Sequence, residues 1–135
     1  MVPVCDRELS RAWRKHFRAY ESLEPVLSHS RNLLLYYAVE CRMKERLLRH
    51  YRVRSYNELP EDAKIGHQIN IGLKLLRAPA FIKRVPSIVT KDAGKTRVHD
   101  HELHEAWRYG KSFDQDNENE IVSVLKGIVE WLESD

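Results

Sequence analysis

Three histidines and several carboxylates lie close together in one stretch of the chain, Arg97-Val-His-Asp-His-Glu-Leu-His-Glu. Histidine titrates near neutral pH, so it can take a proton from one oxygen and return it to another. Cleavage of RNA through its own 2′-hydroxyl requires such a transfer, and a neighbouring arginine would stabilise the charge that develops on the phosphate. We therefore assign acid–base catalysis to His104 and phosphate binding to Arg97, if both lie at the start of one helix.

A metal site is the alternative use of these imidazoles. Zinc accepts imidazole and carboxylate ligands, and on a helix His101 shares a face with His104 and with Glu105. A third ligand would have to come from elsewhere, such as His67. The spacing matches neither HExxH nor a zinc finger, and His99-Asp100 lacks the further ligands of HD phosphohydrolases. We therefore predict no bound metal and no cofactor.

A purely structural role is the third interpretation of the same stretch. In that case His99 and Asp100 cap a helix and the other imidazoles are surface groups, while His67 forms a hydrogen bond across the protein. The two cysteines, Cys5 and Cys41, form no CxxC pair and are expected to be free thiols. No glycine-rich phosphate loop is present, which argues against an NTPase.

The net charge of +3 is distributed unevenly along the chain. Residues 1–60 have five more basic than acidic side chains, and residues 61–111 have four more. Residues 112–135 instead have six more acidic than basic side chains. A basic body with an acidic last segment could bind a polyanion such as RNA, or a second subunit of opposite charge.

Arginines cover much of the surface of the first expected helix, about residues 6–23. Its apolar side chains recur at spacings of four, four and three, which defines one buried stripe. The opposite surface holds basic side chains that could follow a phosphate backbone. Together with two basic residues near position 110, the predicted nucleic-acid contacts are Arg11, Arg14, Arg18, Arg108 and Lys111.

Apolar periodicity and helix-breaking residues predict five helices, and hence an all-α, up-and-down helical bundle forming a single domain over residues 1–135. The first helix begins with Asp6 as its cap, and the last begins near Asn117, at capping-box spacing from Glu120. Residues 79–98 are the least regular stretch. We predict there a segment that covers the bundle, or a short helix, followed by an exposed loop at 90–97. The three remaining helices are expected at about residues 28–51, about 60–78 with the stripe Ile65, Ile69, Leu73 and Leu76, and about 99–109.

No apolar stretch approaches the roughly 18 residues that a membrane span needs, and the amino terminus lacks the order of a secretory signal. We therefore expect a cytoplasmic protein with no membrane contact.

Several segments resemble HEPN domains, in the order in which they occur there. Residues 33–48 resemble the long central helix of these domains, with Ala38, Glu40 and Lys44 matching its pattern A-x-E-x-x-x-K. Residues 66–69 resemble the G-H-D-L sequence at the start of the helix that follows. The resemblance implies an α-helical bundle that is often dimeric.

The resemblance covers about residues 30–132 and includes residues 106–110, which are similar to the arginine–tyrosine pair before the last helix of HEPN domains. Their active motif is an arginine, often followed by Asn, His or Asp, and then a histidine after four to six further residues. Arg97 and His104 meet the six-residue spacing, whereas Val98 departs from the pattern. Many HEPN domains are metal-independent ribonucleases of defence and toxin–antitoxin systems, and others are non-catalytic partners of nucleotidyltransferases.

Two functions from different classes follow. The first is RNA cleavage or RNA binding within a microbial defence or toxin–antitoxin system, by a metal-independent endoribonuclease. The second is a non-catalytic helical adaptor that docks on a partner protein in a nucleic-acid-processing complex. Both imply a homodimer or a subunit of a larger complex, with RNA or another nucleic acid as a partner.

Overall fold

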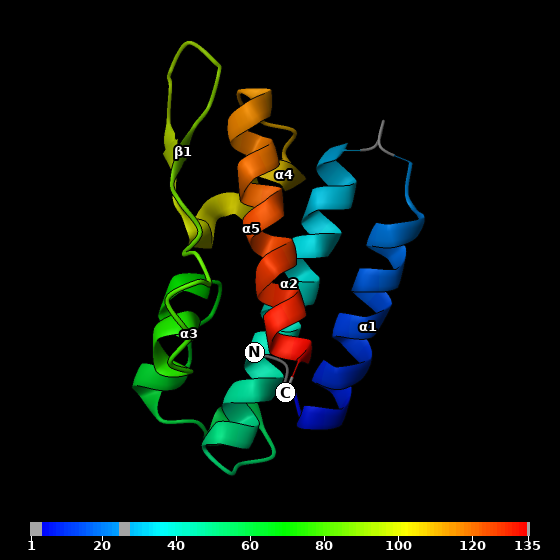
Figure 1. Ribbon diagram of the computed structural model, residues 1–135, viewed down its shortest axis with the longest axis vertical. Helices are drawn as coiled ribbons and strands as arrows, with labels where there is room; N and C mark the ends of the chain where they lie inside the picture. Colours follow the sequence, from blue (N-terminus) through cyan, green and yellow to red (C-terminus); the bar gives the residue numbers. More distant parts are fainter. Residues whose placement is uncertain (1–3, 25–27, 135) are drawn as a thin grey trace.

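Five α-helices form the body of the protein in the computed structural model, which describes residues 4–24 and 28–134 (Figure 1). This architecture confirms the predicted all-α helical bundle. Three helices are long and two are short: α1 (Asp6–Ser22), α2 (Ser28–His50) and α5 (Gln115–Glu133), and then α3 (Ile69–Leu75) and α4 (Leu103–Arg108).

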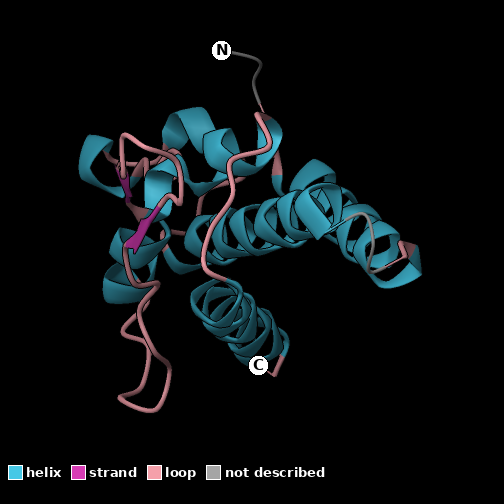
Figure 2. Ribbon diagram, turned by 90° about the horizontal axis from the view of Figure 1, so that it is seen from above, coloured by secondary structure: helices cyan, strands magenta, loops and turns pink. Residues whose placement is uncertain are grey.

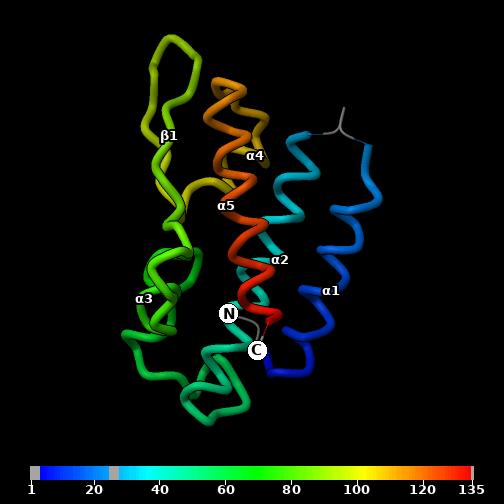
Figure 3. Tube along the Cα trace, viewed as in Figure 1, coloured from blue at the N-terminus to red at the C-terminus, as the bar shows by residue number. Residues whose placement is uncertain are grey.

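Helix α2 lies at the centre of the bundle, and the stretch at residues 33–39 is apolar on all sides. Leu35, Tyr36, Val39 and Met43 are fully buried along it, as is expected for a helix that other elements surround. The chain path shows α1 antiparallel to α2, whereas α5 runs in the same direction as α2 (Figure 3). This direction of α5 is possible because the segment between α3 and α4 returns the chain to the end of the bundle where α2 begins.

Short elements connect the helices, and they include a small sheet that the sequence did not predict (Figure 2). Strand β1 (Ile88–Val89) pairs antiparallel with β2 (Arg97–Val98), with Ile88 opposite Val98. The stretch from 79 to 87 contains no helix, and the loop at 90–97 is exposed except for Thr90. Among the described residues, 3₁₀ turns lie at Tyr56–Glu58, Glu61–Ala63 and Asp100–Glu102.

The predicted third helix is wrong in its first half. The chain after Pro60 forms one 3₁₀ turn and then irregular backbone, and α3 begins only at Ile69. Gly66 has φ +59°, a left-handed conformation that ends any helix there. The carboxylate of Asp100 accepts a hydrogen bond from the backbone N–H of Asn70 at 2.8 Å, so a distant residue stabilises the start of α3.

Two predicted helix caps also shift, by one residue in α1 and by three residues in α5. Helix α1 has Cys5 as its N-cap, with the Glu8 side chain accepting from the Cys5 backbone N–H at 3.0 Å, and Asp6 is its first helical residue. Helix α5 begins at Gln115 because Asp114 accepts a hydrogen bond from the backbone N–H of Asn117 at 3.1 Å. In both cases the observed cap lies just before the predicted one.

Cys5 and Cys41 are both free, as predicted. Within residues 4–24 and 28–134, none of the helices combines the length and the apolar character that crossing a membrane requires.

Candidate functional site

A carboxylate lies in the buried interior of the bundle, on the central helix α2. Glu40 is one helical turn before Lys44, whose Nζ donates a hydrogen bond to Glu40 Oε1 at 3.1 Å. Burying a carboxylate is unfavourable unless it is paired, and α2 itself supplies one partner at the i,i+4 spacing. The second carboxylate oxygen needs a partner from outside the helix.

That partner is His67, in the turn that precedes α3. The left-handed conformation of Gly66 reverses the chain, and His67 Nδ1 lies 2.6 Å from Glu40 Oε2. Because a carboxylate only accepts hydrogen bonds, the proton of the neutral ring is on Nδ1, and Nε2 keeps its lone pair. The His67 side chain is 45% exposed. Glu40 therefore orients an imidazole that solvent can still reach.

The second imidazole is that of His104 in α4, which stacks on His67. The two ring centroids are 3.9 Å apart and their planes are inclined by 29°. His104 is only 4% exposed, and its Nδ1 is buried with no hydrogen-bond partner among the described residues. Burial lowers the pKa of His104, and charge on His67 lowers that pKa further, against the opposing effect of Glu40. These effects favour a neutral ring at His104.

Tyr36 joins the two segments that hold the histidines. Its hydroxyl oxygen lies 2.7 Å from the carbonyl oxygen of His67 and 3.0 Å from that of Asp100. Burial raises the pKa of Tyr36 far above its usual value, so the hydroxyl remains a donor. The ring of the same residue lies 5.7 Å from the ring of His104. Tyr36 thus fixes the backbone on both sides of the imidazole pair.

A cation and a third imidazole lie near this cluster. Arg108 Nη2 donates a hydrogen bond to Tyr37 Oη at 3.0 Å, and the Tyr37 ring is 5.6 Å from the ring of His16 on α1. The charge of Arg108 acts to lower the pKa of His104. Burial lowers the pKa of His16, and Lys15 lowers it further, while Glu40 opposes both. A phosphate bound beside the imidazoles would therefore meet a positive charge from Arg108.

The predicted catalytic pair is only partly represented in this cluster. His104 belongs to it, and its burial excludes the structural interpretation in which it was a surface group. Arg97 lies in β2 and is exposed, and its Nη1 donates a hydrogen bond to Ser87 Oγ at 2.9 Å. The charged groups that act on His104 include Arg108 rather than Arg97. A shared phosphate between Arg97 and His104 remains a prediction.

The other predicted contacts for nucleic acid are all exposed. Arg11, Arg14 and Arg18 lie on α1, and Arg108 lies at the end of α4. Lys111 follows α4, and its Nζ lies 3.4 Å from Asp92 Oδ2. These five side chains are therefore accessible to a polyanion. Their binding role remains a prediction.

Glu40 is the member of the site that reasoning about chemistry from the sequence missed. The available signal was a carboxylate placed directly after the seven-residue apolar stretch at 33–39, at a position where the helix is buried. Glu40 and Lys44 are also two of the residues on which the HEPN resemblance rests, and His67 is a third. The structure brings these three residues together beside His104. The predicted hydrogen bond of His67 across the bundle is confirmed.

The metal alternative has no matching geometry in the part of the chain that the structure describes. There, no group of three or more His, Cys, Asp or Glu side chains is arranged to hold a metal ion. His101 lies 3.6 Å from the carboxylate of Asp100 and stacks on His99, with ring centroids 5.9 Å apart. His99 is the N-cap of the 3₁₀ turn at Asp100–Glu102, as the structural interpretation of that residue expects.

Comparisons with known proteins give no match: no protein-family model, no curated protein and no solved structure is significantly similar to this chain.

Proposed function

We propose that this chain is a metal-independent ribonuclease of a microbial defence or toxin–antitoxin system, with Glu40, His67 and His104 as its acid–base site. One observation supports this proposal above all others: a half-exposed imidazole whose inner nitrogen is held by a buried carboxylate. A carboxylate in this position fixes the tautomer of the histidine and stabilises the imidazolium that forms when the ring accepts a proton. The resemblance to HEPN domains supports RNA as the substrate.

The proposed reaction begins at His67 Nε2, which takes the proton of an RNA 2′-hydroxyl. The 2′-oxygen attacks the adjacent phosphorus while the bond to the 5′-oxygen breaks. The 5′-oxygen takes a proton from water, and the hydroxide that remains takes the proton from His67, which restores the neutral imidazole. The products are a 2′,3′-cyclic phosphate and a 5′-hydroxyl end. The guanidinium of Arg108 stabilises the negative charge on the phosphate oxygens. His104 is buried behind His67, so its proposed part is to position the His67 ring.

Exposed basic side chains on α1, namely Arg11, Arg14 and Arg18, supply a second region of positive charge for the RNA backbone. Each phosphate contact releases bound counterions, so binding should weaken steeply as salt increases. Lys111 adds a further positive charge next to α4. Charge of this kind supports RNA binding without sequence preference.

The test is cleavage of a single-stranded RNA by the purified protein and by the variant His67→Gln. We expect the rate to fall at least about 100-fold, the usual contribution of a general base. His101→Gln is the matched control because His101 is also an exposed histidine of the same region but lies outside the Glu40 pair. Equal rates for the protein and for His67→Gln, with both folded by circular dichroism, would reject the proposed role of His67.

A non-catalytic adaptor is the second candidate function, and two exposed aromatic side chains favour it. Phe81 is 78% exposed and Tyr109 is 71% exposed, and aromatic side chains are enriched where proteins contact a partner. In this case the protein would form a homodimer or a complex subunit and would leave RNA intact. Light scattering measures the molar mass of the protein and of the variant Phe81→Ser, and so distinguishes a dimer from a monomer. A dimer that dissociates in the variant supports docking through Phe81.

A further inference from the structure

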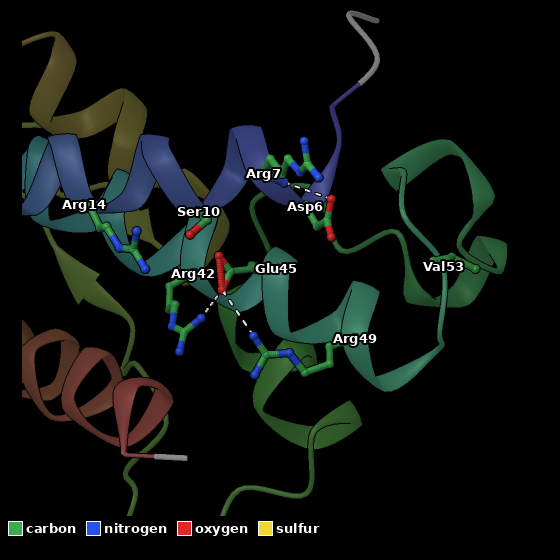
Figure 4. A pocket seen from close by; sticks show the side chains of 8 residues that line it. All are labelled: Asp6, Arg7, Ser10, Arg14, Arg42, Glu45, Arg49 and Val53. Carbon is green, nitrogen blue, oxygen red and sulfur yellow. Dashed lines mark hydrogen bonds and ion pairs between the residues drawn. The ribbon is translucent and has the colours of Figure 1, made fainter.

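A pocket of about 430 Å³ lies between α1 and the second half of α2, and arginines dominate its lining (Figure 4). Helix α1 contributes positions 6, 7, 10 and 14, and helix α2 contributes positions 42, 45 and 49. Residues three and four apart share one face of a helix, so two matched rows of side chains line the two sides of the pocket. None of these residues belongs to the group formed by Glu40, His67 and His104.

The lining has more positive than negative charge. Four arginines and only two carboxylates line the pocket, which leaves an excess of two positive charges. Glu45 is shared, since it pairs with Arg42 and its Oε1 lies 3.9 Å from Arg49 Nη2. Arg14 lies over the Trp13 ring, 5.7 Å from its centroid, and pairs with no carboxylate among the described residues. An anion with two negative charges would neutralise this excess.

Unsatisfied polar atoms also gather beside this pocket. Arg42 is 8% exposed; its Nη1 donates to Glu45 and its Nη2 donates to the carbonyl oxygen of Leu132 at 3.1 Å. Its Nε is buried with no partner in the described chain, and the same holds for Trp13 Nε1 and Glu45 Oε2. A buried donor without an acceptor is costly, and a bound anion is one way in which a folded protein satisfies it.

The pKa of Arg42 is shifted in the direction expected for a buried guanidinium. Burial lowers the pKa of Arg42, and the neighbouring Arg46 and Arg49 lower it further, against the opposing charge of Glu45. The largest cause is burial, which disfavours the charged form of the guanidinium, and Glu133 opposes the shift together with Glu45. Figure 4 shows the guanidinium groups of Arg14, Arg42 and Arg49 around the Glu45 carboxylate.

We propose that this pocket binds the dianionic phosphate of a phosphate monoester. Arg42 is held in place at the base of the pocket, and the exposed side chains of Arg14 and Arg49 can turn onto the ligand. Guanidinium groups bind phosphate with two parallel hydrogen bonds, which a lysine cannot form. The monoester can be a free nucleoside monophosphate or the phosphorylated end of an RNA, and the size of the pocket suits a mononucleotide.

The test uses adenosine 5′-monophosphate as the probe and isothermal titration calorimetry as the assay. We expect the protein to bind this nucleotide but not adenosine. The double variant Arg14→Gln/Arg49→Gln should raise the Kd at least about tenfold, because two charge-assisted contacts are lost. The control Arg77→Gln/Arg84→Gln also removes two exposed positive charges, both outside the pocket, and should leave the Kd within about twofold.

Competition by RNA identifies the natural source of the phosphate. If an octanucleotide with a 5′-phosphate displaces the nucleotide and the same octanucleotide with a 5′-hydroxyl does not, the pocket binds RNA ends. If neither displaces it, the pocket binds free nucleotides. The proposal is overturned if adenosine binds as well as its monophosphate, or if the Arg14→Gln/Arg49→Gln variant keeps the original Kd. Such a failure leaves the proposed catalytic group unaffected, because Glu40, His67, His104 and Arg108 lie outside the pocket. Arg14 alone is also a proposed contact of the RNA backbone.

Discussion

The replacement Glu40→Gln tests the hydrogen-bonded core of the proposed site. The change keeps the size of the side chain but removes its charge, so Lys44 and His67 both lose a charged partner. Hydrogen bonds to charged groups contribute about 1.5–3 kcal/mol, and removing one member of a fully buried ion pair costs about 3–5 kcal/mol. Both partners of Glu40 are partly exposed, so water reduces the loss. We expect the free energy of unfolding to fall by about 2–3 kcal/mol.

The assay is urea denaturation followed by circular dichroism, with Glu61→Gln as the matched control. Glu61 also pairs with a lysine, Lys64, at 3.0 Å, but its side chain is 90% exposed. An exposed pair contributes at most about 1 kcal/mol, so the control should lose much less stability. A double-mutant cycle between Glu40→Gln and His67→Gln should give a coupling energy of about 1–2 kcal/mol. The reasoning is refuted if Glu40→Gln costs no more than Glu61→Gln, or if the coupling energy is zero.

Three further changes test other parts of the structure. Gly72→Ala should lower the free energy of unfolding by about 1–3 kcal/mol in urea denaturation, because the new Cβ would overlap Met43 Sδ in the packed core. A stability equal to that of the unchanged protein would contradict this packing. Asn70→Ala should cost about 2 kcal/mol in the same assay, because its side chain satisfies both the N–H and the C=O of buried Val85, and a loss below about 0.5 kcal/mol would disagree. The free energy of unfolding should fall as the pH drops below about 6.5, by up to about 1.4 kcal/mol per pH unit. The reason is that His104 takes up a proton in the unfolded chain but resists it in the folded protein, where its pKa is lowered. The variant His104→Phe should show a smaller slope.

The parts of the fold that follow from local periodicity were predictable. The apolar stretch before Glu40 indicated a central buried helix, and α2 covers Ser28–His50. The stripe Ile121, Leu125, Ile128 and Leu132 is buried on α5, as its spacing predicted. Such patterns report burial directly because one face of a helix must meet the core.

The parts that depend on distant contacts were not predictable in this way. The start of α3 depends on a hydrogen bond from Asn70 to Asp100, which is 30 positions away in the sequence, and on the positive φ of Gly66. The two-residue strands β1 and β2 are too short to show alternation. The same limit applies to the candidate site, since His104 was identified by residue type, whereas the link between Glu40 and His67 crosses 27 positions.

The most direct test of the proposed chemistry compares two substrates in the presence of EDTA: an RNA and the same oligonucleotide with 2′-deoxyribose at every position. Mass spectrometry of the products identifies the new ends. The mechanism at His67 predicts cleavage of the RNA alone, without any divalent metal, to give 2′,3′-cyclic phosphate and 5′-hydroxyl ends. Cleavage of the 2′-deoxy substrate, or RNA cleavage that stops in EDTA, would contradict it.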